Sequence, residues 1–199
     1  MPKQLFGAKP TVLRCSRCGK FVDWEDARLQ VVCGCRPHLD LPPVLVREAE
    51  DRDRRVVNEL FARDFGRLRL VAFGEELQLE SMAAIVAELE TDIAGALAYR
   101  PRGDDFQIVA LATDPMWQRS GVGVHLVQEA EGLAREQGRP RVLMSTTNDN
   151  LPALYFYQRR GYRISEVLAG EVTRHFKAEP SVGFAGIPIR DEIHLVKDV

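Results

Sequence analysis

Apolar residues along the chain follow two spacings, one typical of strands and one typical of helices. A short apolar run predicts a strand over 44–47, and a nearly continuous run over 106–113 predicts a buried central strand. Two more runs, 82–89 and 93–99, flank Glu90-Thr91-Asp92 and predict a hairpin. Later strands are predicted over 141–145, 162–168 and 192–197.

Helical spacing predicts three helices, over about 48–64, 121–137 and 151–160. The buried stripe of the second helix is expected to consist of Val124, Val127, Ala130 and Leu133. Residues 67–82 fit either a further helix or an irregular arm. The alternating order of elements predicts an α/β fold, a mixed sheet with helices on both faces.

The segment Leu41-Pro42-Pro43 stiffens the backbone and marks a domain boundary. We therefore expect a small module over 1–43 and a larger domain over 44–199. The module carries seven Lys/Arg against four Asp/Glu in its first forty residues, which is a weak nucleic-acid signal and is more typical of a solvated face.

Composition excludes several classes of protein. With 45% hydrophobic and 28% charged residues and a net charge of −2, the chain is typical of a globular protein, not a polyanion binder. It has no apolar run long enough for a membrane span and no signal-peptide core at its start. We expect a cytoplasmic protein whose four cysteines are in a reducing environment.

A glycine-rich turn follows the buried strand and opens into a helix. It reads Gln118-Arg119-Ser120-Gly121-Val122-Gly123. The unpaired N–H groups of a helix start, the helix dipole and one arginine suit a phosphate. The spacing fits neither a P-loop nor the dinucleotide fingerprint, and the plain alternative is a tight turn with packing glycines.

This turn resembles the Q/R-x-x-G-x-G/A signature of the GNAT family of N-acetyltransferases. The resemblance implies the GNAT fold and acetyl-CoA as co-substrate. It also implies roles for individual residues. The backbone of Leu111, Ala112 and Thr113 would bind the pantetheine arm, and the CoA pyrophosphate would be held by Arg119, Ser120, Gly121, Val122, Gly123 and Val124. Gln118 would be a further cofactor-binding residue.

A second segment, residues 150–162, resembles the family motif N-x-x-A-x-x-F-Y-x-x-x-G-F. Its matching residues are Asn150, Ala153, Phe156, Tyr157, Gly161 and Tyr162. By this resemblance Asn150 contacts CoA and Tyr157 is the general acid that protonates the leaving thiolate. The plain alternative for Tyr157 is a packed core aromatic.

The general base has no clear candidate. The strand over 141–145 carries no acid, although some N-terminal-amine acetyltransferases have a glutamate there. Glu88, Glu90 and Asp105 are substitutes, as is a water relay. The connection over 170–190, with His175, Phe176 and Phe184, either lines the acceptor pocket or packs as a plain loop.

The four cysteines form two pairs, Cys15/Cys18 and Cys33/Cys35, separated by 14 residues. Such pairs are typical of a Cys₄ structural zinc site on a small ribbon. His38 as a replacement ligand, iron, and disulfides or free thiols stay open as alternatives. A metal would supply folding energy that so short a module lacks.

The sequence therefore predicts an N-acetyltransferase acting on a primary amine, which is either a small molecule or a protein amine, with a zinc module that recruits a macromolecular partner or steadies the fold. Two alternatives remain: a ribosome- or nucleic-acid-associated module, and a CoA-binding regulator without catalysis. The acceptor is not identified, and a homodimer is one of the oligomeric states left open.

Overall fold

The computed structural model describes residues 12–14, 21–23, 43–118, 120–176 and 181–199. The chain divides into two compact units, Met1–Pro42 with Arg119–Gly121, and Pro43–Gln118 with Val122–Val199. In the first unit, β1 (Val12–Arg14) and β2 (Phe21–Asp23) pair antiparallel, with Val12 opposite Asp23. The predicted metal ligands Cys15, Cys18, Cys33 and Cys35, and also His38, lie outside the described residues.

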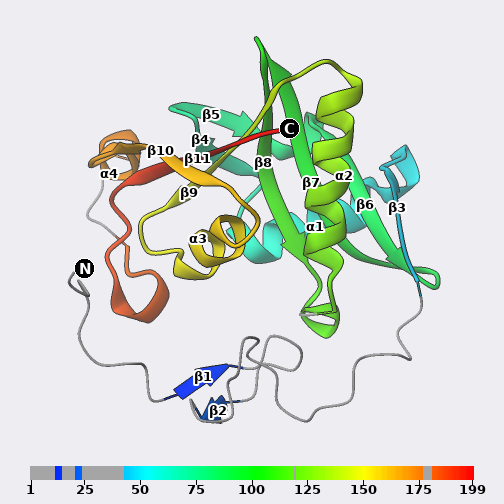
Figure 1. Ribbon diagram of the computed structural model, residues 1–199, viewed down its shortest axis with the longest axis horizontal. Coiled ribbons are helices and arrows are strands. Elements are labelled where there is room, and N and C mark those ends of the chain that lie inside the picture. Colours follow the sequence, from blue (N-terminus) through cyan, green and yellow to red (C-terminus); the bar gives the residue numbers. More distant parts are fainter. Residues whose placement is uncertain (1–11, 15–20, 24–42, 119, 177–180) are drawn as a thin grey trace, which may run out of the picture. The chain divides into compact units, whose positions relative to one another are not determined.

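The second unit is built on a sheet whose seven described strands have the order β10-β11-β9-β8-β7-β6-β3 (Figure 1). Neighbouring strands are antiparallel except β8 and β9, which are parallel and are joined through helix α2. The strand bounds are β3 (Val44–Glu48), β6 (Ala83–Leu89), β7 (Asp92–Arg102), β8 (Asp105–Thr113), β9 (Arg141–Thr147), β10 (Arg163–Leu168) and β11 (Glu192–Asp198). The predicted mixed sheet is confirmed.

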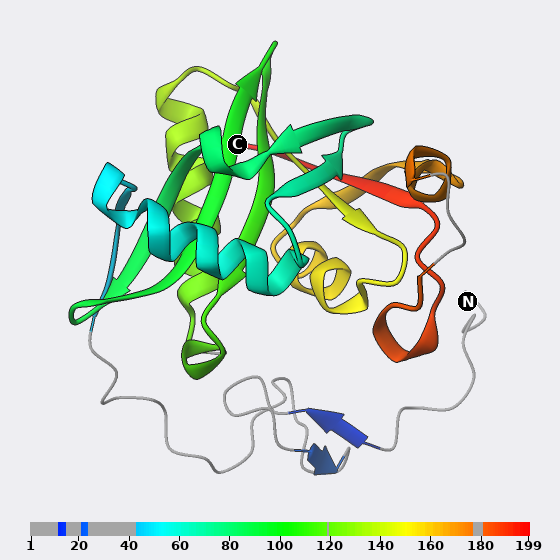
Figure 2. The same ribbon diagram turned by 180° about the vertical axis from the view of Figure 1, so that it is seen from behind.

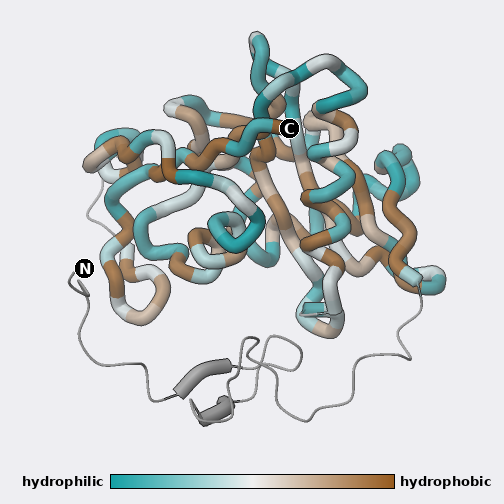
Figure 3. The backbone as a smooth tube through the Cα atoms, viewed as in Figure 1, coloured by the Kyte–Doolittle hydropathy of each residue, from teal (hydrophilic) through white to brown (hydrophobic). Residues whose placement is uncertain are grey.

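Two layers cover this sheet. Helices α2 (Val122–Glu136) and α3 (Leu151–Gln158) pack on one face, and α1 (Arg54–Phe65) packs on the other (Figures 1 and 2). Apolar residues concentrate along the central strands between the layers (Figure 3). The predicted arrangement of helices on both faces is therefore confirmed.

The stretch 67–82 is neither a helix nor an irregular arm. It contains the hairpin of β4 (Arg69–Ala72) and β5 (Glu75–Gln78), followed by the 3₁₀ turn η3 (Leu79–Ser81). In the two-residue loop, Phe73 has φ of 56° and Gly74 has φ of 70°. Both residues therefore adopt the left-handed backbone conformation, as the twist of a tight hairpin requires. Phenylalanine is rare in this conformation, and the turn was therefore not predicted from sequence.

Helix boundaries and faces differ from the sequence prediction in two places. The first predicted helix starts later than expected, because the 3₁₀ turn η2 (Asp51–Asp53) precedes α1. In α2, Val127 and Ala130 are buried as predicted, but Val124 and Leu133 are only half-buried. The other buried residues of this helix are Val122, Leu126, Glu131 and Ala134, because the sheet-facing side is rotated relative to the predicted stripe.

The connection between β10 and β11 contains α4 (Glu171–Phe176) and the short turn η5 (Phe184–Gly186). Residues just after β9 hold it in place. The side-chain oxygen of Asn148 accepts hydrogen bonds from the N–H groups of Arg190 and Asp191, and the Asp149 carboxylate accepts one from Phe184 N at 3.0 Å. In the described part of the chain, no helix is long and apolar enough to cross a membrane.

Candidate functional site

Strands β8 and β9 separate in the middle of the sheet. They pair only from Asp105 opposite Arg141 to Ile108 opposite Met144. Beyond that point β8 continues to pair with β7 as far as Thr113, and β9 continues to pair with β11 as far as Thr147. The two strands thus leave an opening in the sheet. Along this opening, the main chain of β8 pairs only with β7, and that of β9 pairs only with β11.

A β-bulge lies where the separation begins. Ala98 of β7 is opposite Ala110 and Tyr99 is opposite Ile108, so Val109 has no partner in the register. A bulge bends its strand and increases the local twist. The bend at Val109 therefore directs the rest of β8 away from β9.

The far end of β8 is held against β7 and α1. Asp114 N donates to Ala94 O at 2.8 Å, and Arg63 of α1 donates to Thr113 O at 3.0 Å. Asp114 also caps the turn η4 (Pro115–Trp117) by accepting from Met116 N. These bonds keep β8 from closing back onto β9.

The glycine-rich turn leads from η4 into α2. Gly121 has φ of 96°, a conformation that favours glycine, and the first amides of α2, from Val122 onward, lack partners within the helix. Gln118 is exposed and Arg119 lies outside the described residues. Backbone N–H groups at the start of a helix are the donors that an anion requires.

The end of β8, the first turn of α2 and α3 converge on the α2 face of the sheet. A Cβ placed on Gly123 would lie 3.5 Å from Phe156 Cζ and 3.8 Å from Leu111 Cδ2. Of the other two predicted pantetheine-binding residues, Ala112 is buried on the α1 face, and Thr113 is half-buried at the strand end. The two sequence motifs, which are far apart along the chain, therefore meet beside the opening.

Helix α3 begins at a capping asparagine. Asn150 Oδ1 accepts a hydrogen bond from Ala153 N at 3.2 Å, which satisfies one free N–H of the first turn. Tyr157, at the other end of the helix, is 3% exposed and packs edge-on against Phe156 and Tyr162. Burial raises the pKa of the Tyr157 phenol well above its usual range, so the hydroxyl keeps its proton.

On the opposite face of the sheet, a buried polar cluster adjoins the opening. Glu192 of β11 is 2% exposed, and its carboxylate accepts hydrogen bonds from Ser145 Oγ and from the Phe73 and Gly74 N–H groups of the β4–β5 turn. His194 Nε2 lies 2.8 Å from the same carboxylate. Burial alone would raise the pKa of Glu192, but the hydrogen bonds from His194, Ser145 and Phe73 outweigh it and lower this pKa.

Sequence reasoning did not find this cluster. The residues Ile193 and Leu195 alternate with Glu192 and His194, so a glutamate and a histidine occupy one face of a strand that is buried on both faces. Two titratable residues at alternate positions in such a strand are the signal that could have found it.

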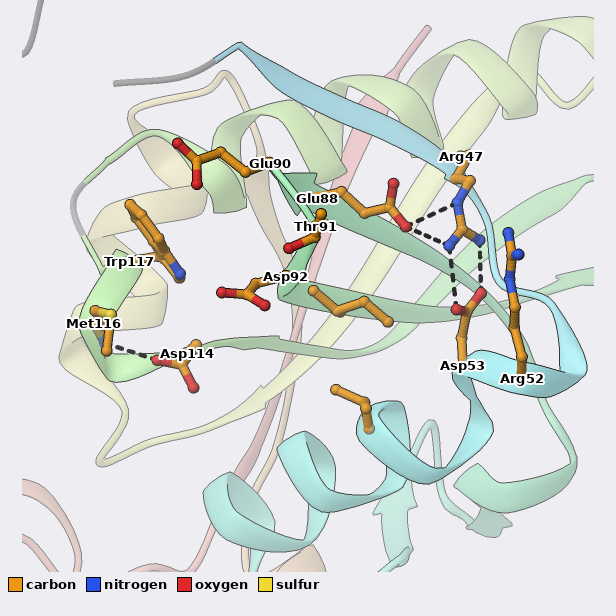
Figure 4. A pocket seen from close by; sticks show the side chains of 12 residues that line it. Arg47, Arg52, Asp53, Glu88, Glu90, Thr91, Asp92, Asp114, Met116 and Trp117 are labelled. Carbon is orange, nitrogen blue, oxygen red and sulfur yellow. Dashed lines mark hydrogen bonds and ion pairs between the residues drawn. The ribbon is translucent and has the colours of Figure 1, made fainter. Parts of the chain in front are cut away.

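The residues predicted as candidates for the general base, Glu88, Glu90 and Asp105, are not part of this cluster. Glu88 and Glu90 line a concavity of about 710 Å³ beside the β6–β7 turn and the start of α1 (Figure 4). There Arg47 pairs with both Glu88 and Asp53, which lowers the pKa of Asp53. Asp105 pairs with Arg141 at 2.8 Å, at the end where β8 and β9 remain together.

Comparison with known proteins agrees with this geometry. The model of the acetyltransferase (GNAT) family matches residues 46–162, a range that contains both motifs. The uncharacterized protein YdhI of Bacillus subtilis (strain 168) is 33% identical over 144 residues, which are 70% of this chain and 89% of that protein. A streptothricin acetyltransferase of Streptomyces lavendulae is 30% identical over 93 residues, 46% of this chain and 48% of that one.

Among solved structures, a Bacillus subtilis acetyltransferase in complex with CoA has a TM-score of 0.60 and 22% identity. The match covers 80% of this chain and 99% of that chain, which shows a common fold. Together with the family match, the separated strands β8 and β9 and the two converging motifs lead to one assignment. The chain belongs to the acetyltransferase (GNAT) family and is an acyltransferase that uses acetyl-CoA.

Proposed function

We propose that this protein transfers the acetyl group of acetyl-CoA to a primary amine. The observation that carries the proposal is the opening between β8 and β9, which has the start of α2 and Tyr157 on one side and a buried carboxylate on the other. A thioester that enters from the α2 face and an amine that enters from the opposite face would meet in this opening.

The main chain along the opening suits the pantetheine arm. From Ala110 to Thr113, β8 has a strand partner only on its β7 side, so backbone groups on the other side are available to amides of the ligand. We assign this contact to Leu111, Ala112 and Thr113. The pyrophosphate is assigned to the turn and the first residues of α2, namely Arg119, Ser120, Gly121, Val122, Gly123 and Val124. Further CoA contacts are assigned to Gln118 and Asn150.

The chemistry requires an acid for the leaving group. When the amine attacks the thioester carbonyl, the C–S bond breaks and the thiolate of CoA leaves. Tyr157 is our candidate for the proton donor, since its buried phenol stays protonated and packs against Phe156, which lies next to Gly123. Main-chain N–H groups of β8 would stabilise the oxyanion of the tetrahedral intermediate.

The acceptor would be bound on the hairpin side of the sheet. His175 of α4 lies 3.8 Å from Glu76 of β5, so the long connection before β11 and the β4–β5 hairpin approach each other there. Phe184 of the same connection is exposed. Streptothricin is one acceptor to test, because a relative is named as a streptothricin acetyltransferase.

A binding and turnover panel tests the proposed function. Saturating acetyl-CoA should raise the melting temperature, since a ligand at about 100 times its Kd adds roughly 2.7 kcal/mol to the free energy of unfolding. Thiol release should then follow with one acceptor class among peptides with a free N-terminus, lysine peptides, polyamines and streptothricin. Absence of any thermal shift would contradict acetyl-CoA binding, and a shift without release from any class would favour a CoA-binding regulator.

We propose further that residues 1–43 form a module separate from the domain 44–199, with a structural zinc ion on Cys15, Cys18, Cys33 and Cys35. In support, β1 and β2 pair as a hairpin whose connection contains Cys15 and Cys18, as in small zinc ribbons. A zinc-stabilised module of this kind suits recruitment of a macromolecular partner.

Metal analysis tests the zinc site. We expect about one zinc ion per chain in purified protein, and its loss in the double variant Cys15→Ser/Cys18→Ser, because a tetrahedral site needs all four ligands. Acetyl-CoA binding should be retained in this variant. Zinc-free wild-type protein, or zinc content unchanged by the double substitution, would contradict the assignment.

A further inference from the structure

The buried cluster beside the opening continues to the molecular surface. Ser145 Oγ lies 2.5 Å from Glu192 Oε1, which lies 2.8 Å from His194 Nε2. His194 Nδ1 lies 3.2 Å from Glu166 Oε2 on β10. The chain of hydrogen bonds thus crosses three adjacent strands, β9, β11 and β10, without a break.

The two ends of this chain have different surroundings. Ser145 is the first residue of β9 after the last β8–β9 pair, so it borders the opening. Glu192 is almost fully buried, whereas the Glu166 side chain is 57% exposed. The hydrogen bonds therefore connect the opening with bulk solvent.

Acetyl transfer to an amine requires a path by which a proton can leave the site. A primary amine is mostly protonated at neutral pH, and only the neutral form has the lone pair that attacks a thioester. The proton must leave the site for each turnover. We propose that Ser145, Glu192, His194 and Glu166 form a proton relay that carries this proton from the acceptor ammonium to solvent; the inference rests on the proposed acetyl transfer to an amine.

One proton passes along the relay in each turnover. The ammonium N–H bond breaks and its proton moves to Ser145 Oγ, while the Ser145 hydroxyl proton moves to Glu192 Oε1 and on to Nε2 of neutral His194. The imidazolium, which lies between two carboxylates, releases its Nδ1 proton through Glu166 to water. The neutral amine then attacks. After the product has left, Nδ1 regains a proton from water through Glu166, and Nε2 loses its proton through Glu192 and Ser145 to water in the empty opening, which restores the starting tautomer.

The electrostatic surroundings of His194 favour a relay that stores a proton. Burial lowers the pKa of His194, but the hydrogen bond and charge of Glu192 and the charge of Glu166 outweigh it, so the pKa is raised above 6.5. Among the described neighbours, the β4–β5 turn contributes the uncharged ring of Phe73, 5.2 Å away, and β9 contributes the neutral Ser145. The two carboxylates therefore control its protonation.

The pH dependence of activity tests the relay. In wild-type protein, kcat/KM should rise with pH as His194 loses its proton, with a midpoint above 6.5. In Glu166→Gln the midpoint should move to lower pH by about half a unit or more, because one of the two carboxylates that stabilise the imidazolium is lost. NMR titration of ring-labelled histidine should show that the His194 pKa is lower in Glu166→Gln than in wild-type protein, by the same amount as the kinetic midpoint.

The matched control is Asp198→Asn, which removes an exposed carboxylate from the far end of β11, where it pairs with Arg163. It should leave both the pH midpoint and the His194 titration unchanged. Ser145→Ala should lower kcat/KM for the best amine of the panel about 10²-fold, as expected for loss of a proton acceptor. With methoxyamine, which is largely unprotonated at neutral pH, it should have little effect.

The outcomes separate the relay from the function on which it rests. A kinetic midpoint that does not follow the His194 titration in Glu166→Gln, or equal losses of Ser145→Ala with protonated and unprotonated amines, would overturn the relay while acetyl transfer stands. Wild-type protein that releases no CoA with any amine would contradict the proposed function, and the relay with it.

Discussion

Replacement of Tyr157 by phenylalanine is expected to lower kcat about 10²-fold, the usual loss when a general acid is removed. The physical reason is the leaving thiolate, which needs a proton in or soon after the transition state. Burial keeps the Tyr157 hydroxyl protonated. Its hydroxyl forms no hydrogen bond within the described part of the chain, so the phenylalanine variant should fold normally.

Steady-state kinetics with acetyl-CoA and the best amine of the panel provides the measurement, and KM for acetyl-CoA should change little. Tyr155→Phe is the matched control, because Tyr155 lies on the same helix but is 67% exposed. It should retain wild-type kcat. If both variants are fully active, Tyr157 is a packing residue and another group protonates the thiolate.

Replacement of Gly95 by alanine is expected to lower the free energy of unfolding by about 1–3 kcal/mol, the usual cost of overpacking a core. A Cβ on Gly95 would lie 2.7 Å from Val122 Cγ1 and 3.0 Å from Ala112 O. Main chain cannot move away as a flexible side-chain end can. Gly95 therefore allows α2 to lie close to β7 and β8, where its first turn borders the opening.

The same substitution at Gly132 is the control, since a Cβ there would have no heavy atom within 4 Å. Gly132 lies inside α2, where alanine is favoured over glycine by about 0.5–1 kcal/mol. Urea unfolding should therefore show a lower free energy of unfolding for Gly95→Ala and a higher one for Gly132→Ala. Weakened acetyl-CoA binding should accompany Gly95→Ala alone, because that variant displaces the start of α2.

Local patterns in the sequence were sufficient to predict most helices and strands of the larger domain. The apolar run of β8, the glycines that follow it and the helical spacing of α2 each depend on residues close together in the chain. The Asn150–Tyr162 segment was found in the same way, from a fixed spacing within one helix and its ends. Such features are set by backbone conformation and periodicity, which neighbouring residues control.

The register of the sheet could be determined only from the folded structure. The bulge at Val109 and the short β8–β9 ladder create the opening, yet neither strand alone shows where pairing stops. The exposure of Tyr157 likewise depends on its packing against Tyr162 and Phe156.

The polar cluster shows the difference most clearly. By itself the sequence determined the strands, the two motifs and the family resemblance, because these are short-range patterns. Only the tertiary structure joined Glu192 to Phe73 N and to Ser145, partners 119 and 47 residues away in the chain. Such contacts depend on the pairing of distant strands and on the unexpected β4–β5 turn, because a buried carboxylate is stabilised by whichever donors the complete fold brings to it.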